Sequence, residues 1–222
     1  MNRAELPAAL RDAISSDLKP VRPLSPVWRR ALIVGAMAVV VMIVVVSTTQ
    51  LRADLASLSI LVGWGAAFLE LFIGIVLIGL SLRESVPGLA LSPGAIAAAL
   101  GLGAAVNIII VFATWAGSSA ANAYTEPFME GVVCSRAETL FGVPALIVTL
   151  ILVARALPLR PHVVGLLAGC GAGMIGDGIN HLLCPISTLR HVLVWHSGVI
   201  VLLALLGWGA GLGWEFYEAR RA

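Results

Sequence analysis

Long apolar stretches alternate with short polar ones along most of this 222-residue chain. A helix of about 20 apolar residues crosses the hydrocarbon core of a bilayer. The apolar residues follow one another continuously, and an open sheet would leave backbone groups unpaired in lipid, so strands are not expected. The pattern predicts an all-α membrane protein with six transmembrane helices, near residues 29–48, 60–81, 93–115, 139–156, 162–182 and 192–214.

The composition supports one membrane domain, at residues 29–214, with an N-terminal arm (1–28) and a short tail (215–222). Hydrophobic residues make up 59% of the chain and charged residues 12%, which excludes an ordinary soluble core. No cleavage site for a signal peptide follows the first apolar stretch, so we expect that stretch to stay in the membrane. The loops leave no room for a soluble catalytic domain. Any chemistry must therefore use the loops or the bundle interior. We expect no enzyme activity, no cofactor and no direct binding of nucleic acid.

The distribution of basic residues predicts the orientation. If the N-terminus is cytoplasmic, eleven Lys and Arg residues lie on the inner side and three on the outer side. Cytoplasmic loops of membrane proteins carry the excess of basic residues. Both termini are therefore predicted to be cytoplasmic, and the three outer residues are Arg52, Arg136 and Arg190.

Two cysteines fall on the outer side of this topology, Cys134 just before the fourth predicted helix and Cys184 just after the fifth. A short inner turn joins these two helices, so they should pack as neighbours with their outer ends together. Thiols in an oxidising compartment can form a disulfide, be oxidised reversibly or bind a soft metal ion. Three interpretations stay open: a functional pair, a structural disulfide and two unrelated thiols.

Three histidines lie in the segment HLLCPISTLRHVLVWH, residues 181–196. His181, His191 and His196 are candidate metal ligands beside the cysteines, because imidazole suits borderline metal ions. The alternative is that they are interfacial polar residues bonded to loop carbonyls. A matched second half of a metal motif and a C-x-x-C motif are both missing from the sequence, so the pattern alone assigns no metal site.

The fifth predicted helix contains the segment GLLAGCGAGMIGDG, residues 165–178. Gly165, Gly169 and Gly173 recur every four residues, which is the small-residue ridge that lets membrane helices approach closely. Cys170 lies in the middle of this helix, where a thiol behaves as a small apolar side chain. The segment is not a phosphate-binding loop, which would follow a strand and end in Lys-Ser or Lys-Thr.

Polar residues also occur inside the predicted spans. Glu70 falls near the centre of the second helix, and Asp177 and Asn180 fall in the outer half of the fifth. A charge at the bilayer centre costs about 2.5–3.5 kcal/mol on insertion scales, so such residues usually face the bundle interior. They are either protonated and bonded to partners such as Asn107, or they line a wet cavity.

The N-terminal arm carries an apolar stripe. Four apolar residues recur every four positions, which predicts a short amphipathic helix over residues 6–18. The following prolines favour an extended spacer up to the membrane. Such a helix gains order by docking into an apolar groove of a protein partner or by lying on membrane lipid. The stripe consists of Leu6, Leu10, Ile14 and Leu18.

Four features in order resemble one family, the NrsF-type membrane anti-sigma factors of bacteria. They are the segment DLKPVRPLSPVWRR (17–30), the outer Cys134, the turn LPLRP (157–161) and the segment LLCPISTLRHVLVWH (182–196). The resemblance covers nearly the whole chain.

The resemblance implies a multi-pass protein of the bacterial inner membrane that holds an extracytoplasmic-function sigma factor inactive on the cytoplasmic side. It implies that Cys134 and Cys184 sense heavy-metal or oxidative stress from the periplasm. The family's N-terminal signature falls on Pro20, Val21, Arg22 and Pro23. The oligomeric state stays open.

Two other functions compete with this interpretation. One is a small transporter for a metal ion or thiol compound, with Glu70, Asn107 and Asp177 along its path. The other is a membrane thiol oxidoreductase, which the missing C-x-x-C motif disfavours.

Overall fold

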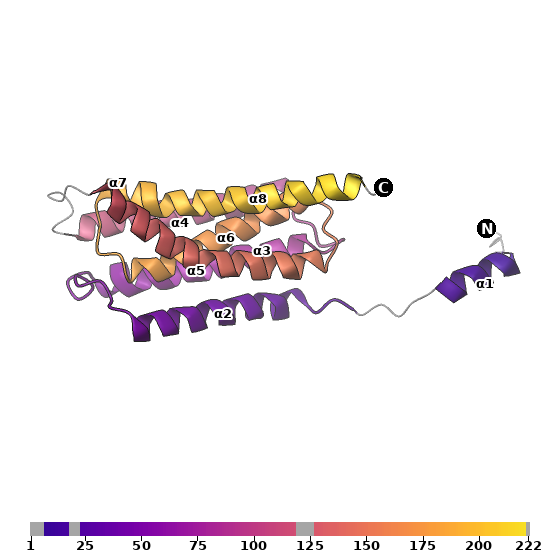
Figure 1. The fold of residues 1–222 in the computed structure, drawn as a ribbon, viewed down its shortest axis with the longest axis horizontal. Helices are drawn as coiled ribbons and strands as arrows, with labels where there is room; N and C mark the ends of the chain where they lie inside the picture. The colour runs from indigo at the N-terminus through magenta and orange to yellow at the C-terminus, as the bar shows by residue number, and fades with distance from the viewer. Residues whose placement is uncertain (1–6, 18–22, 119–126, 221–222) are drawn as a thin grey trace.

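The structure, a computed structural model, describes residues 7–17, 23–118 and 127–220. It consists of a bundle of long helices and a short helix, α1 (Ala8–Asp17), that lies apart from the bundle (Figure 1). The start of the first bundle helix and the end of the last lie at the same end of the bundle (Figure 1). The long helices are α2 (Val27–Thr48), α3 (Ala66–Glu84), α4 (Pro93–Gly117), α5 (Phe128–Ala154), α6 (Pro161–His181) and α8 (Ser197–Ala219).

Two short π-helical turns extend these helices. The turn η1 (Leu61–Gly65) leads into α3, and η2 (Val192–His196) joins the one-turn helix α7 (Leu189–His191) to α8. With these extensions, six helices among the described residues are long and apolar enough to cross a membrane. The prediction of six apolar helices in an all-helical chain is confirmed.

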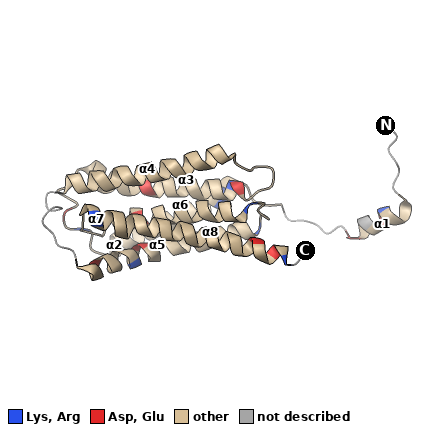
Figure 2. Cartoon of the chain, turned by 90° about the horizontal axis from the view of Figure 1, so that it is seen from above, with Lys and Arg blue, Asp and Glu red and all other residues tan. Residues whose placement is uncertain are grey.

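The surface of the bundle is apolar over its length. Charged residues lie mainly near the helix ends and on α1 (Figure 2). Exposed apolar side chains on this scale are unstable in water but suit contact with lipid chains. The chain is therefore a membrane protein. Examples of the exposed side chains are Ile43, Phe72, Ile109, Leu140, Ile151 and Val201.

The central helix of the bundle is α6. Of its most apolar stretch 78% is buried, against 22–50% for the other spans. Its glycines face three different helices. A side chain at Gly169 would collide with the backbone of α8, one at Gly171 with α3 and one at Gly176 with α5. The absence of side chains at these positions therefore allows three helices to pack directly against the α6 backbone.

The predicted start of the fourth helix is wrong. The helix begins at Phe128 and not near residue 139, so Cys134 lies inside α5 instead of before it. Polar residues lower the hydropathy of the first turns of α5. Tertiary packing overrides this signal, because Glu138 is fully buried and Gly131 packs under the indole ring of Trp195.

The sixth predicted helix is longer than expected at both ends. It starts with α7 at Leu189, and α8 continues to Ala219. Most of the segment predicted as a tail (215–222) is therefore helical. Thr188 provides a clear start, because its side chain accepts a hydrogen bond from the backbone N–H of His191.

The predicted amphipathic helix of the arm corresponds to α1. Leu10 is 47% exposed, and Pro23 lies in an exposed, non-helical segment. Leu6, Leu18, Pro20, Val21 and Arg22 lie outside the described residues, as does the side chain of Ile14.

The backbone contact between α6 and α8 gives a first prediction. Changing Gly169 to Val should destabilise the bundle, because the new side chain meets the backbone of Leu203 and Ala204. Overpacking of this kind costs about 1–3 kcal/mol or more. Thermal unfolding in detergent micelles measures the effect. The control is Gly209→Val on the exposed face of α8, where a Cβ atom meets nothing within 4 Å. Equal stability of both variants would contradict the packing described.

Candidate functional site

The structure brings Cys134 and Cys184 together at one end of the bundle. Cys134 lies in the second turn of α5, and Cys184 lies in the loop that follows α6. Their Sγ atoms are 3.0 Å apart, although 50 residues separate them in the chain. As expected, α5 and α6 pack as neighbours. Cys184 is buried, with 3% of its surface exposed.

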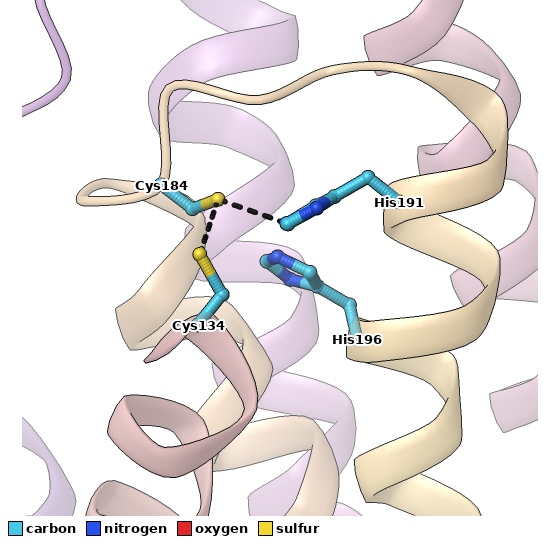
Figure 3. A group of neighbouring side chains, drawn as sticks. All are labelled: Cys134, Cys184, His191 and His196. Carbon is cyan, nitrogen blue, oxygen red and sulfur yellow. Dashed lines mark hydrogen bonds between the residues drawn. The ribbon is translucent and has the colours of Figure 1, made fainter. Parts of the chain in front are cut away.

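Two histidine rings point toward the sulfur atoms (Figure 3). The Nε2 atom of His191 lies 3.2 Å from the Sγ atom of Cys184, and the ring centroid of His196 lies 5.3 Å from that of His191. Five positions separate these histidines, so an α-helix would turn them about 140° away from each other. The π-helical turn η2 contains more residues per turn, which brings both rings to the same side.

The loop that carries Cys184 is anchored by Arg52. The guanidinium group of Arg52 donates to the Oγ atom of Ser187 (2.6 Å) and to the carbonyl group of His181 (3.4 Å). It also pairs with Asp54 (2.6 Å). The hydrogen bond from Arg52 lowers the pKa of the Asp54 carboxyl group, so this pair is charged at neutral pH. The position of Cys184 is thus fixed by polar contacts to a second loop.

A polar network lies next to the thiols. The Nδ1 atom of His196 is 2.7 Å from the Oδ1 atom of Asp177. The side-chain amide of Asn107 donates to the Oδ2 atom of Asp177 (3.1 Å), and Ser197 donates to the Oδ1 atom of Asn107 (2.7 Å). Asn107 was suggested from the sequence as a partner for the acidic residues inside the spans, and in the structure it bonds to Asp177.

Two further carboxyl groups border this network. Glu70 is 1% exposed and contacts the carboxyl group of Asp177. Glu138 is fully buried, with Oε2 3.7 Å from the Nδ1 atom of His196. Glu138 was not among the predicted site residues, because the late predicted start of the helix placed it in a loop. Its position four residues after Cys134, on the same helix face, was the available signal.

The other residues singled out in the sequence do not join the cluster. The Nε2 atom of His181 is 2.9 Å from the carbonyl oxygen of Val62, so its ring belongs to the packing of η1. Asn180 supports the site indirectly, since its side chain donates to the carbonyl group of Cys134 (3.4 Å). Cys170 lies in the middle of α6, within the expected apolar surroundings.

Ion pairs hold the opposite end of the bundle. Arg160, before α6, pairs with buried Glu84 of α3 (2.6 Å). Glu84 accepts a hydrogen bond from the backbone N–H of Leu91, and Arg160 donates one to the carbonyl group of Leu91. At the start of α6, His162 pairs with Glu215 of α8. These contacts join the ends of α3, α6 and α8 and were not predicted from the sequence.

The arrangement favours thiol chemistry. The hydrogen bond with Cys134, followed by burial, raises the pKa of the Cys184 thiol, while His191 acts in the opposite direction. Both sulfur atoms are cysteine thiols in this structure. The pair can lose two protons and two electrons to an oxidant and form a disulfide, or it can lose two protons and bind a metal ion.

Comparison with protein families identified the family of this chain. The family model described as "NrsF: Negative regulator of sigma F" matches residues 14–214. This match confirms the resemblance found in the sequence. No curated protein and no solved structure matches the chain.

The raised pKa of Cys184 can be tested by thiol alkylation. Changing Cys134 to Ala removes the hydrogen bond that contributes most to this pKa, so alkylation of Cys184 should begin at lower pH. Mass spectrometry of iodoacetamide-treated protein, site by site over a pH series, measures the shift. Cys170→Ala, in the middle of α6, is the control and should leave the profile of Cys184 unchanged. A profile that moves to higher pH in the Cys134 variant would contradict this assignment.

Proposed function

Because the chain belongs to the NrsF family of negative regulators of sigma F, we propose that it is an inner-membrane anti-sigma factor. It binds an extracytoplasmic-function sigma factor on the cytoplasmic side and keeps it from RNA polymerase. It releases the sigma factor when heavy metals or oxidants modify Cys134 and Cys184 from the periplasm. The observation that carries this proposal is the pair of thiols, 3.0 Å apart, at the end of the bundle opposite the arm.

The arm provides a binding element for the sigma factor. Helix α1 is ten residues long, and its described side chains are exposed. A helix this short is marginal in water and is stabilised when its apolar face is buried against a partner. Leu10 lies on that face and is exposed in the chain alone. The arm therefore supplies an apolar surface that a sigma factor covers.

The thiol pair provides the sensor. Sulfur atoms 3.0 Å apart need only a small movement to reach the disulfide bond length of about 2 Å. Oxidation breaks two S–H bonds and forms one S–S bond, with two electrons passing to the oxidant and two protons to water or a base. A shift of the sigma factor from 99% bound to 99% free requires about 5.5 kcal/mol of preference for the releasing state. A covalent bond or a metal site supplies energies of this size.

The rival interpretation as a transporter rests on Glu70, Asn107 and Asp177. In the structure, Asp177 and Asn107 support His196 beside the thiols. Their burial is therefore explained by a role in the sensor, and the anti-sigma function requires no transport path. A transporter would instead show altered uptake of its substrate when Glu70 is changed to Gln.

Binding of the sigma factor is tested by co-purification with the intact chain. Leu10→Glu should weaken binding at least about tenfold, since burial of a Leu side chain contributes about 1.5–3 kcal/mol. Ala8→Glu is the matched control on the opposite face of α1, and it should have no effect. Deletion of residues 1–26 should abolish co-purification. Undiminished binding after the deletion would refute the role of the arm.

The orientation can be tested with a membrane-impermeant maleimide. Ser57→Cys, in the loop after α2, should react in spheroplasts, because this loop lies at the thiol end of the bundle. Ser16→Cys, on α1, should react only after lysis. Mass spectrometry distinguishes these sites from the native cysteines. The reverse labelling pattern would place the thiols in the cytoplasm and exclude the proposed sensing from the periplasm.

A further inference from the structure

We propose that Cys134, Cys184, His191 and His196 form a tetrahedral binding site for one divalent metal ion of the zinc and cadmium class. One donor atom from each residue lies within 4.8 Å of all the others. Two thiolates and two imidazoles are a ligand set that zinc prefers in proteins, and soft thiolates also favour cadmium. Three separate segments contribute these residues: α5, the loop after α6 and the start of the last helix (Figure 3).

The orientation of His196 is the strongest indication of a ligand. The residue is 3% exposed, and its Nδ1 atom faces Asp177. Its Nε2 atom is fully buried and has no hydrogen-bond partner among the described residues. The ring of His196 is directed toward the sulfur atoms (Figure 3). A buried nitrogen without a hydrogen bond is costly unless a ligand occupies the space in front of it.

The residues around His196 match the surroundings of known metal ligands. A histidine that binds a metal usually donates its other ring N–H to a carboxylate, which fixes the tautomer and the orientation of the ring. Asp177 provides this carboxylate, and the amide of Asn107 holds the second carboxylate oxygen. The loop with Cys184 is fixed in turn by Arg52. His196 and Cys184, two of the four proposed ligands, are therefore held in place before a metal ion binds.

The distances define what binding would change. Zn–S bonds of about 2.3 Å at the tetrahedral angle place two sulfur atoms about 3.8 Å apart. The Sγ atoms are now 3.0 Å apart. A metal ion would separate Cys134 from Cys184, whereas oxidation to a disulfide would draw the same atoms together. Metal binding and oxidation therefore change the distance between the two sulfur atoms in opposite directions.

The charges also suit a buried site. Each thiol gives up its proton, and each sulfur donates an electron pair to the metal ion. Each neutral imidazole donates the lone pair of its Nε2 atom. Two protons leave for one divalent ion, so the metal with its four ligands carries no net charge. A neutral complex avoids the cost of an isolated charge in an apolar environment.

The metal site itself rests on geometry alone. The statement that its occupancy releases the sigma factor rests on the proposed function. The two ideas fail separately: metal binding without a sigma partner would refute the function, and a sigma partner without metal binding would refute the site.

The test uses the reduced, intact chain in detergent micelles without oxygen. Co²⁺ serves as the probe, because tetrahedral Co²⁺ has intense visible bands and thiolate ligands add a charge-transfer band. We expect one equivalent to bind with both signatures, and Cd²⁺ to displace it. His191→Gln and His196→Gln should each weaken binding by at least about 100-fold, and Asp177→Asn by about 10-fold or more. His162→Gln, at the opposite end of the bundle, is the control and should bind like the native chain.

Three results would overturn the site. They are failure of the reduced native chain to bind Co²⁺, an octahedral spectrum without thiolate bands, and unchanged affinity in both histidine variants. Thermal unfolding without metal identifies variants that fail to fold. If His191→Gln fails to fold, His191→Asn replaces it, because asparagine also lacks the imidazole donor.

A reporter of sigma-dependent transcription separates the two signals in cells. Cys134→Ser with Cys184→Ser should lose induction by both Cd²⁺ and a thiol oxidant. In His191→Gln, induction by Cd²⁺ should fall at least about tenfold. Induction by the oxidant should be kept, because a disulfide needs only the cysteines. Equal induction by Cd²⁺ in the His191 variant and in the native chain would show that the histidines are not ligands.

Discussion

The close backbone packing around α6 is the constraint on which the rest of the structure depends. Within a bilayer the hydrophobic effect does not drive helices together, so association relies on close contact and on hydrogen bonds. Glycines on α6 provide this contact with three neighbours, for example Gly165 against Gly207 of α8. Because α6 is enclosed in this way, Asp177 and Asn180 near its C-terminal end are buried as well. The fold thus places polar groups where each requires a partner.

The buried polar groups explain why the site has the composition observed. Removing a carboxyl group from water is costly unless another group bonds to it. The partners of Asp177 include His196 and Asn107. The bond to His196 fixes the imidazole ring so that its other nitrogen faces the cysteines. The same interaction that makes the acidic residue tolerable inside the bundle therefore orients a potential ligand toward the thiols.

Much of the fold was predictable, because six long apolar stretches leave few alternatives in lipid. The neighbouring positions of Cys134 and Cys184 also followed from helix connectivity. Hydropathy did not identify the first turns of α5, since polar residues such as Glu138 are held there by tertiary contacts. Nor could it predict the π-helical turn η2, which brings His191 and His196 to one side. A local deviation of this kind depends on packing against neighbouring helices and leaves little trace in the pattern of apolar residues.

The packing also determines which helix can respond to a change at the thiols. The pair α6 and α8 is joined by backbone contacts along its length and by His162 and Glu215 at its far end. Helix α5 carries Cys134 and contains Pro144, which removes one backbone hydrogen bond and allows a bend. Helix α5 can therefore move with Cys134 more easily than α6 or α8 can. The C-terminal end of α5, far from the thiols, leads through a short turn to Arg160, which pairs with Glu84. Under the proposed function, movement of α5 would carry a change at the thiols to this ion pair, at the end of the bundle from which the arm extends.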